Sequence, residues 1–540
     1  MGTHHLLGRT LLTLGCLLLV TASEGRFAPS APHSITMAPQ TTASTALTFD
    51  QAVGISSVDP VNPLGYPSAY EALFLVGNTL VTFDKKMTPQ PSLATHWSVK
   101  ADKRTWIFTL RSGVRFQDGT PFTAQDVKRD FDRMMDPASD LTQQAIWSHF
   151  AAVTVINPHT VAIVTKQPFA ATLDYLAHGS AVILRIPSGN ATSIGLHPIG
   201  TGPYTLSSLQ PNTQALFSAN LHYWGGKPAL QRIVMRAVPN AETRVADLRA
   251  GNAQLIDAVP AVDLPNLNGV GTIHVDAAPS WATTYLDLNT HYGPLTNPLV
   301  RRAIGEAIDT NGLIRAIFRG YADPLHSPLA PSMPSYVAAS TLSYNLSQAQ
   351  ELLHRAGYSS KDGKLVSGNR QLHLTLTAPT GLYPNDTEVA QAIQQELQGL
   401  GIKMTLRTVP AASYFTFVRQ STPTSGYGDM FLWAFNPSNG DPAYTLSINF
   451  GKPGTAAALW NKSFYNSTQL QKVLEQQSVT LNQKARLALL ARAQKLIAAG
   501  TPAVWLYAPR NNIVMSSAVS GVVVLPVQFL LLANASLRSS

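Results

Sequence analysis

Charged residues are scarce in this sequence. Only 13% of its 540 residues are Asp, Glu, Lys or Arg, against about 25% in an average soluble domain. Two interpretations remain open: adaptation to an acidic medium, in which carboxylates are protonated and ion pairs contribute less, or a compositional bias of the lineage. The formal net charge is +9. Because the basic residues are scattered, with no run of five or more, we expect no nucleic-acid partner.

Cysteine is almost absent, since Cys16 is the only one. This excludes a disulfide framework and a thiolate metal site. The sequence also lacks His-Glu-x-x-His, a Gly-x-Ser-x-Gly elbow and a Gly-Lys-Ser/Thr phosphate loop. Its 14 histidines are dispersed, whereas a metal site needs several ligands that converge. We therefore expect a protein that is not an enzyme and that holds no cofactor and no metal.

No hydrophobic run reaches the length of a transmembrane helix. The apolar stretch 11–20 follows Arg9 and ends in small residues before Ala22, which is typical of a cleaved signal peptide over residues 1–22. Cys16 leaves a lipoprotein open as the alternative, but the apolar residues that continue after it favour simple cleavage. Residues 23–46 are rich in Ala, Pro, Ser and Thr and predict a flexible spacer. An exported protein is expected, in the periplasm or on the outer face of the cytoplasmic membrane.

The remainder of the chain interleaves strands and helices, which indicates a mixed α/β fold without solenoid repeats. Aromatic and β-branched residues alternate over 106–110 as in a strand. Asn297, Asp309 and Asn345 are placed as helix N-caps. A further helix is expected over 386–400, followed by a strand over 403–409. The apolar stretch 522–532 is expected to be a buried strand.

Several segments occur in the order seen in one known family. They include Leu-Ala-Thr-His-Trp at 93–97, Asp-Gly-Thr-Pro-Phe-Thr-Ala-Gln-Asp-Val at 118–127, Pro-Ile-Gly-Thr-Gly-Pro-Tyr at 198–204, Tyr-Trp-Gly-Gly-Lys-Pro at 223–228, Arg-Val-Ala-Asp-Leu-Arg-Ala-Gly at 244–251, Val-Arg-Arg-Ala-Ile at 300–304 and Ala-Gln-Glu-Leu-Leu-His-Arg-Ala-Gly-Tyr at 349–358. Together they cover nearly the whole mature chain. The sequence resembles the peptide/nickel class of extracytoplasmic solute-binding proteins of ABC importers, family 5. Most of these motifs are expected to be scaffold, because turn residues have sufficient backbone reasons to be there.

The resemblance implies a bilobed fold of the periplasmic-binding-protein type II, with an extra domain inserted in the first lobe. Lobe I would comprise 47–74, 196–283 and 500–540, the inserted domain 75–195, and lobe II 284–499. The ligand would lie between lobes that close on a hinge.

The ligand-facing segment implied by the resemblance is 431–442, which is similar to the family stretch Gly-Trp-x-x-Asp-x-x-x-Pro. In peptide receptors the first aspartate of this stretch pairs with the ligand's ammonium group. The two ways of counting along this longer loop place Asn436 or Ser438 at that position, and Asp441 is the acid that remains nearby. Either the longer loop has re-aimed Asp441, or the ligand lacks a cationic amine. Trp433, Phe435 and Tyr66 are the candidates for apolar contact with the ligand.

The expected function is capture of a peptide or similar organic solute and its delivery to the permease subunits of an ABC importer, by a monomeric protein. A receptor of the same fold for a non-peptide ligand, such as an oligosaccharide or a metal chelate, is one alternative. A sensor or chaperone role is another, because a fold does not fix a function. A secreted hydrolase is the third class and has no motif in its support.

Overall fold

The computed structural model describes residues 46–61, 67–136, 147–186, 194–424 and 428–538. The predicted signal peptide, the spacer up to residue 45 and Cys16 lie outside these residues, as does Tyr66. Residues Ser44–Ser540 form one compact unit, and all contacts given below belong to it. Among the described residues, no helix is both long enough and apolar enough to cross a bilayer.

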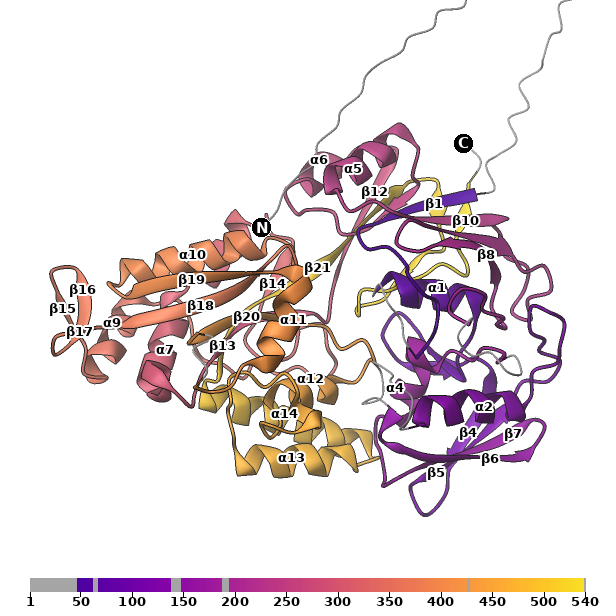
Figure 1. Cartoon of the computed structure of the whole chain (residues 1–540), viewed down its shortest axis with the longest axis horizontal. Helices are drawn as coiled ribbons and strands as arrows, with labels where there is room; N and C mark the ends of the chain where they lie inside the picture. The colour runs from indigo at the N-terminus through magenta and orange to yellow at the C-terminus, as the bar shows by residue number, and fades with distance from the viewer. Residues whose placement is uncertain (1–45, 62–66, 137–146, 187–193, 425–427, 539–540) are drawn as a thin grey trace, which may run out of the picture. The chain divides into compact units, whose positions relative to one another are not determined.

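A large mixed β-sheet runs through the unit (Figure 1). In the described part of the chain its strand order is β19-β18-β20-β13-β21-β11-β1-β10-β9-β8, and β12 and β14 also pair with β21. The strands are β1 (Ala46–Gln51), β8 (Tyr204–Gln210), β9 (Gln214–Ala219), β10 (Arg232–Ala237), β11 (Leu255–Ile256), β12 (Ile273–Pro279), β13 (Thr283–Leu288), β14 (Ala322–Pro324), β18 (His373–Thr380), β19 (Lys403–Pro410), β20 (Met430–Phe435) and β21 (Ala503–Ser516).

The long strand β21 belongs to two groups of strands. Its first part pairs antiparallel with β13, from Ala503 to Tyr507. Its second part pairs with β12, from Arg510 to Ser516, and with β11. Pro509 lies between the two stretches and has no N–H to donate to a ladder. One strand therefore connects β13, β14 and β18–β20 to β1 and β8–β12.

Helices cover both faces of the sheet around β13, β18 and β20. Because successive strand residues point to opposite faces, Leu286 enters a core with Ile304 and Ile393, while Tyr285 enters another with Trp433. The first core is lined by α7 (Pro298–Ala307), α9 (Leu346–Arg355) and α10 (Asp386–Gly399), and the second by α11 (Ala411–Gln420), α12 (Pro442–Phe450), α13 (Thr468–Ser478) and α14 (Gln483–Gly500). Short elements here are η3 (Gly293–Thr296), α8 (Thr310–Ala316), β15 (Ser359–Lys361), β16 (Lys364–Ser367), β17 (Arg370–Gln371) and η4 (Ala456–Ala458).

The segment between β1 and β8 builds a separate four-stranded sheet of order β4-β5-β7-β6. Phe108, Phe131 and Trp147 fill the space between this sheet and α2. The elements are α1 (Ser68–Val76), β2 (Val81–Phe83), β3 (Pro89–Pro91), β4 (Ala94–Val99), β5 (Thr105–Leu110), α2 (Ala124–Met135), β6 (Phe150–Asn157), β7 (Thr160–Thr165), α4 (Thr172–Ala177) and η1 (Gly179–Ala181). The helices α5 (Ala241–Ala250) and α6 (Leu264–Leu267) follow β10 and β11. The domain limits given above remain a prediction.

The expected helix starts are confirmed. Asn297, Asp309 and Asn345 are the N-caps of α7, α8 and α9. Their side chains accept hydrogen bonds from the backbone N–H groups of Leu299, Gly312 and Gln348, in the first turn of each helix. These bonds satisfy donors that a helix leaves unpaired in its first turn. The helix expected over 386–400 is α10, and the strand expected over 403–409 is β19.

The single buried strand expected over 522–532 is wrong. This stretch forms a hairpin of two short strands, β23 (Val523–Val524) and β24 (Leu530–Leu531), flanked by β22 (Val519–Ser520) and β25 (Ser536–Leu537). Pro526 cannot donate to a ladder, and Gln528 has a φ of 66°, which reverses the chain. The hydrophobic residues are nevertheless buried, as Leu525, Val527 and Phe529 show.

Candidate ligand-binding site

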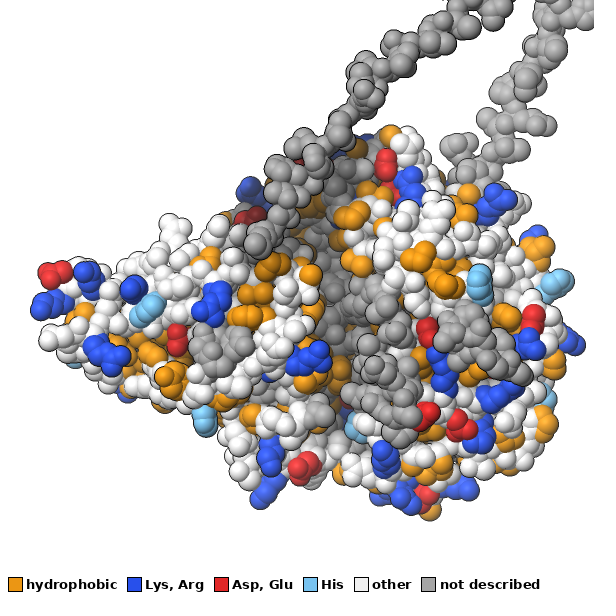
Figure 2. Space-filling view, viewed as in Figure 1, with side chains coloured by type: hydrophobic (Ala, Val, Ile, Leu, Met, Phe, Trp, Pro, Cys, Tyr) orange, Lys and Arg blue, Asp and Glu red, His pale blue; other side chains and the backbone are white. Residues whose placement is uncertain are grey.

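The candidate site is the loop 436–441, which joins β20 to α12. Asp441 caps α12, because its carboxylate accepts a hydrogen bond from the N–H of Ala443 at 3.0 Å, and Pro442 occupies the first helical position. Gly440 has a φ of 73°, and a Cβ placed there would lie 2.7 Å from the ring of Phe83 and 3.1 Å from Met87 Cε. Glycine is therefore needed both for the backbone conformation and for the close approach of the segment around β2. Figure 2 shows a hollow on the viewed face beside α11, with hydrophobic side chains along its edge.

Trp433 is a core residue in this structure, with 1% of its surface exposed. Its indole Nε1 donates to Asn449 Oδ1 at 3.1 Å, and its ring packs against Trp460 and Phe415 at centroid distances of 5.1 and 5.9 Å. Phe435, at the end of β20, is half-buried and lies against Tyr444. Trp433 is thus part of the core, and Phe435 is the aromatic residue that borders the loop.

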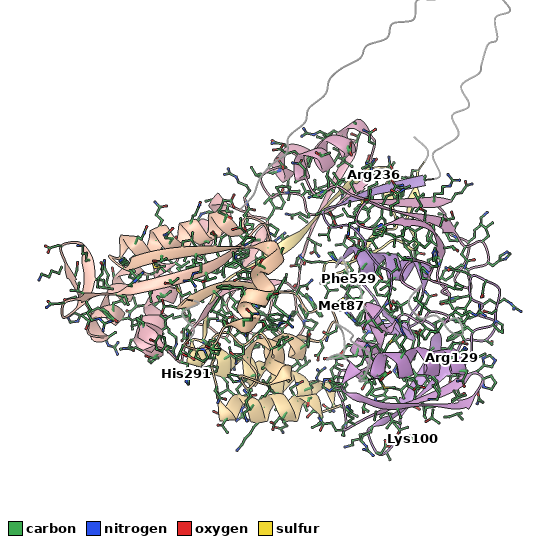
Figure 3. The ribbon with its side chains drawn as sticks, in the orientation of Figure 1. Met87, Lys100, Arg129, Arg236, His291 and Phe529 are labelled. Carbon is green, nitrogen blue, oxygen red and sulfur yellow. The ribbon has the colours of Figure 1, made fainter. Side chains whose placement is uncertain are left out.

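Asn436 connects the loop to the C-terminal hairpin. Its Nδ2 donates to the carbonyl oxygen of Val527 at 2.8 Å and to Gln528 Oε1 at 3.1 Å. The neighbouring Phe529 packs edge-on against Tyr70 of α1, and it is labelled with Met87 in Figure 3. Three segments that are distant in the sequence therefore meet around Asn436.

Ser438 lies against a buried histidine that the sequence analysis did not select. The backbone N–H of Ser180 donates to Nδ1 of His178, so Nδ1 carries no proton and Nε2 is the donor to Ser438 Oγ, at 3.2 Å. Burial lowers the pKa of His178 to about 3, which keeps the ring neutral. The hydroxyl of Ser438 accepts this bond and still has its own hydrogen to donate.

Asp441 is held by Arg486 of α14. The guanidinium Nη2 lies 2.6 Å from Asp441 Oδ1, and Nη1 lies 4.0 Å from Asp174 Oδ2 of α4. With an Arg partner and the Ala443 N–H, the carboxylate of Asp441 is already compensated. Its replacement by alanine would remove a helix cap and leave Arg486 short of a partner.

A second carboxyl near the loop is also unsuited to hold a cation. Glu71 of α1 is fully buried and accepts hydrogen bonds from Gln51 Nε2 at 2.5 Å and from the N–H of Leu530 at 3.0 Å. Burial raises the pKa of Glu71 well above its ordinary value, and the nearby Asp257 raises it further. Burial therefore disfavours the charged form of Glu71, and both of its oxygens already accept hydrogen bonds.

The loop also carries a donor that has no partner in the described part of the chain. Asn439 is completely buried, and its Oδ1 accepts from the N–H of Asp441 at 3.1 Å. Its Nδ2 has no hydrogen-bond partner within the described residues. A buried donor without a partner is costly, so an acceptor atom placed beside Asn439 would be stabilised.

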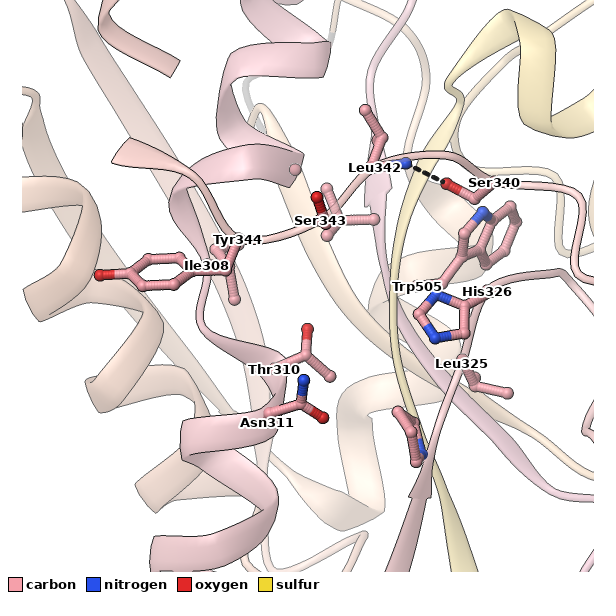
Figure 4. A pocket seen from close by; sticks show the side chains of 13 residues that line it. Ile308, Thr310, Asn311, Leu325, His326, Ser340, Leu342, Ser343, Tyr344 and Trp505 are labelled. Atoms are coloured by element: carbon pink, nitrogen blue, oxygen red, sulfur yellow. Dashed lines mark hydrogen bonds between the residues drawn. The ribbon is translucent and has the colours of Figure 1, made fainter. Parts of the chain in front are cut away.

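A separate hollow of about 80 Å³ lies between α7, α8 and β21 (Figure 4). It is bordered by Thr310, Asn311, His326, Tyr344 and Trp505, and Ser340 Oγ accepts from the N–H of Leu342 at its edge. None of the expected ligand residues that the structure describes lies in it. Over the described ranges no three His, Cys, Asp or Glu side chains come together as metal ligands would.

Comparison with known proteins identifies the class. Residues 88–457 match the model of the bacterial extracellular solute-binding proteins, family 5. The chain is 30% identical over 433 residues to the glutathione-binding protein GsiB of Escherichia coli strain K12, covering 80% of this chain and 81% of that protein. The chain therefore belongs to the family 5 solute-binding proteins, which serve ABC importers, as the sequence motifs predicted.

Solved structures show the same fold. HbpA2 from Haemophilus parasuis aligns with a TM-score of 0.79 and 22% identity, over 92% of this chain and all of that one. DppA from Helicobacter pylori, in complex with the peptide STSA, aligns with a TM-score of 0.76 and 24% identity, over 92% and 98%. NikA from Brucella suis, in complex with Fe(III)-EDTA, aligns with a TM-score of 0.81 and 21% identity, over 91% and 100%. The mixed α/β architecture is thus that of the bilobed periplasmic binding proteins.

Proposed function

We propose that this protein binds a peptide-sized organic solute through hydrogen-bond donors on the loop 436–441, and that the solute's charged amine is not captured there. The observation that supports this is the state of the loop's one carboxylate. Asp441 is engaged by Arg486 and by the N–H of Ala443, whereas the Ser438 hydroxyl and the Asn439 amide can donate. Such donors match carbonyl or carboxylate oxygens of a short peptide or of glutathione.

The relatives favour a solute of this size. GsiB is named for binding glutathione, and DppA was solved with a short peptide. Phe435 would supply apolar contact, with Asn436 and Ser438 on the loop. We further propose an exported, monomeric receptor without enzymatic activity that delivers its ligand unchanged to the permease. Recovery of an intact ligand from the purified protein, measured by native mass spectrometry, would support the absence of turnover.

Acetylation of a ligand's amine is expected to change affinity little. A calorimetric panel should compare glutathione and short peptides with their N-acetylated forms, and we expect the dissociation constant to change by less than about threefold. Capture of an ammonium by a buried carboxylate would instead make acetylation cost roughly 2–5 kcal/mol, or more than about thirtyfold. A loss of that size would refute the proposal.

Asn439→Ala is expected to weaken the same ligands about tenfold, because it removes the loop's buried donor. Asn266→Ala, on the exposed surface of α6, is the matched control and should leave affinity unchanged. Equal affinities for the two variants would exclude Asn439 from the site. If no peptide or glutathione binds, oligosaccharides and metal chelates become the ligands to test.

A further inference from the structure

Arg486 lies where three parts of the chain meet. It projects from α14 and binds Asp441 at the start of α12 through Nη2, at 2.6 Å. Its Nε donates to Gln477 Oε1 of α13 at 3.2 Å. Its Nη1 faces Asp174 of α4 at 4.0 Å. The first two partners lie on the same side as the ligand loop, and Asp174 comes from the segment that carries the four-stranded sheet.

Around Asp174, further contacts join the region of α4 to the region of α12–α14. The N–H of Ala170 donates to the carbonyl oxygen of Ser478 at 2.7 Å. His178 donates to Ser438 across the same boundary, and Gly440 approaches Phe83. These contacts can exist only while the region of α4 lies against α12–α14. Bilobed binding proteins open and close by hinge motion, so opening at this boundary would break them together.

The charges at this boundary do not balance. One guanidinium faces two carboxylates, and Asp441 has both the short contact to Arg486 and a backbone hydrogen bond. Asp174 stands at 4.0 Å from Arg486, and no hydrogen bond to its carboxylate exists among the described residues. A buried charge is costly unless it is paired and hydrogen-bonded. The side chain of Asp174 is 18% exposed, so its carboxylate is partly desolvated and is the least compensated of the three.

We propose that Arg486 and Asp174 are positioning residues for ligand capture: Arg486 holds the ligand loop through Asp441, and Asp174 joins this pair on closure and takes up a proton as it does so. Neither residue needs to touch the ligand. The proposal does not depend on which solute is bound. It makes closure, and with it ligand retention, more favourable as the medium becomes more acidic.

The environment of Asp174 in the closed form explains why acid favours closure. Burial raises its pKa well above the ordinary value, Asp441 raises it further, and Arg486 lowers it. On opening, the side chain becomes more exposed to water and its pKa returns toward the ordinary value of about 3.9. Closure thus binds a proton at pH values between the two, and the closed form gains as pH falls through that window.

Other titratable groups face the same place and must be separated from Asp174. Tyr175 of α4 and Tyr444 of α12 have raised pKa values because of burial, and neither ionises near neutral pH. His149, which stacks on Phe169 at 4.1 Å between ring centroids, has a pKa lowered by burial and raised by Asp441, with Lys166 lowering it. The rings against His149 are those of Phe169 and Tyr175, in its own segment, whereas Asp441 lies across the boundary, so closure favours a proton on His149 and acts in the same direction as Asp174. A variant of Asp174 isolates its contribution.

The test measures closure directly and needs no ligand. Spin labels at Lys100→Cys and Gln476→Cys, both exposed positions, are introduced in a Cys16→Ser background, because Cys16 is the only cysteine. Distance distributions are recorded by double electron–electron resonance from pH 5.5 to 8. For the wild-type chain we expect the ratio of closed to open molecules to rise as pH falls, by up to about tenfold per pH unit, which is the limit for one proton.

In the Asp174→Asn variant, the closed population at pH 8 is expected to be at least as high as in the wild type. The variant should also lose the part of the rise in closed molecules at lower pH that comes from protonation of Asp174. Asp132→Asn, on the exposed side of α2 and paired with Lys128, is the control and should behave as the wild type. Arg486→Met should open the molecule at every pH; if it fails to fold, the comparison of Asp174→Asn with Asp132→Asn decides alone. An unchanged pH profile in Asp174→Asn, or a more open molecule at pH 8, would overturn the proposal.

Discussion

Replacing Arg301 with alanine is expected to lower the free energy of unfolding by about 4 kcal/mol. Arg301 lies in the first turns of α7 and is buried, yet no carboxylate of the described residues forms an ion pair with it. Its guanidinium donates four hydrogen bonds to backbone carbonyl oxygens, those of Leu295 (2.7 Å), Thr296 (3.1 Å), Gly500 (2.9 Å) and Thr501 (2.9 Å). These atoms belong to η3 and to the end of α14. The substitution would leave four carbonyl acceptors without their donor, two of them in buried and two in part-buried bonds.

The neighbouring residue supplies the control. Arg302 is half-exposed and lies 4.0 Å from Glu306, so Arg302→Ala should change stability by less than about 1 kcal/mol. Arg301→Lys should cost nearly as much as Arg301→Ala, because an ammonium group cannot reproduce the planar fork of donors. Equilibrium denaturation followed by tryptophan fluorescence measures all three. Equal stability of the Arg301→Ala and Arg302→Ala variants would contradict the assignment.

The free energy of unfolding is expected to fall as pH rises from 6.5 to 8. Asp130 of α2 is completely buried, its Oδ2 accepts from the N–H of Leu184 at 2.6 Å, and its Oδ1 has no partner among the described residues. Burial raises the pKa of Asp130 to about 8. Burial also raises the pKa of Glu396 to about 7 and that of Asp287 well above its ordinary value.

Proton linkage explains why the free energy of unfolding falls as pH rises. A carboxyl with a raised pKa in the folded state keeps its proton on folding and loses it on unfolding, so stability is greatest below the unfolded value near 3.9 and declines as pH rises toward the folded value. Each such proton contributes about 1.4 kcal/mol per pH unit within its window. The neutral buried His178, with its lowered pKa, acts in the opposite direction only below about pH 6.5, which is why the measurement starts there.

Asp130→Asn should reduce the slope of stability against pH by one proton and should raise stability at pH 8. An asparagine oxygen can still accept from the N–H of Leu184. The exposed Asp132→Asn on the same helix should leave the slope unchanged. Chemical denaturation across pH 6.5–8 decides, and a flat wild-type profile would contradict the prediction. A declining profile would favour acid adaptation over compositional bias as the reason for the scarce charge.

The sequence predicted those parts of the fold that depend on neighbours in the chain. Asn297, Asp309 and Asn345 were identified as caps because a cap bonds to a residue two or three positions away. Pro526 and Gln528 interrupt the expected strand for an equally local reason, because the turn at these residues outweighs the surrounding hydrophobicity. The family motifs predicted the architecture. One of their arginines, Arg301, donates hydrogen bonds to backbone carbonyl groups of η3 and of the end of α14.

The candidate site was harder to predict, because its contacts connect distant positions. The loop 436–441 was found by resemblance, but His178 approaches Ser438 from 260 positions away in the sequence, and Arg486 approaches Asp441 from 45. No periodicity or spacing marks such a pair. Gly440 is a local feature of this loop: it has the positive φ that glycine allows, and it lies where the segment around β2 comes close.

Because β21 is shared by two groups of strands, neither group can be completed until residues 503–516 have been synthesised. Residues 503–516 emerge late in synthesis, yet β13 and β14 on one side and β11 and β12 on the other all need them as a pairing partner. Neither group can complete its hydrogen bonding while the chain is still attached to the ribosome at an earlier residue. Such long-range pairing slows folding. A product truncated before Ala503 would therefore lack the finished sheet in both halves at once, rather than retaining one intact lobe.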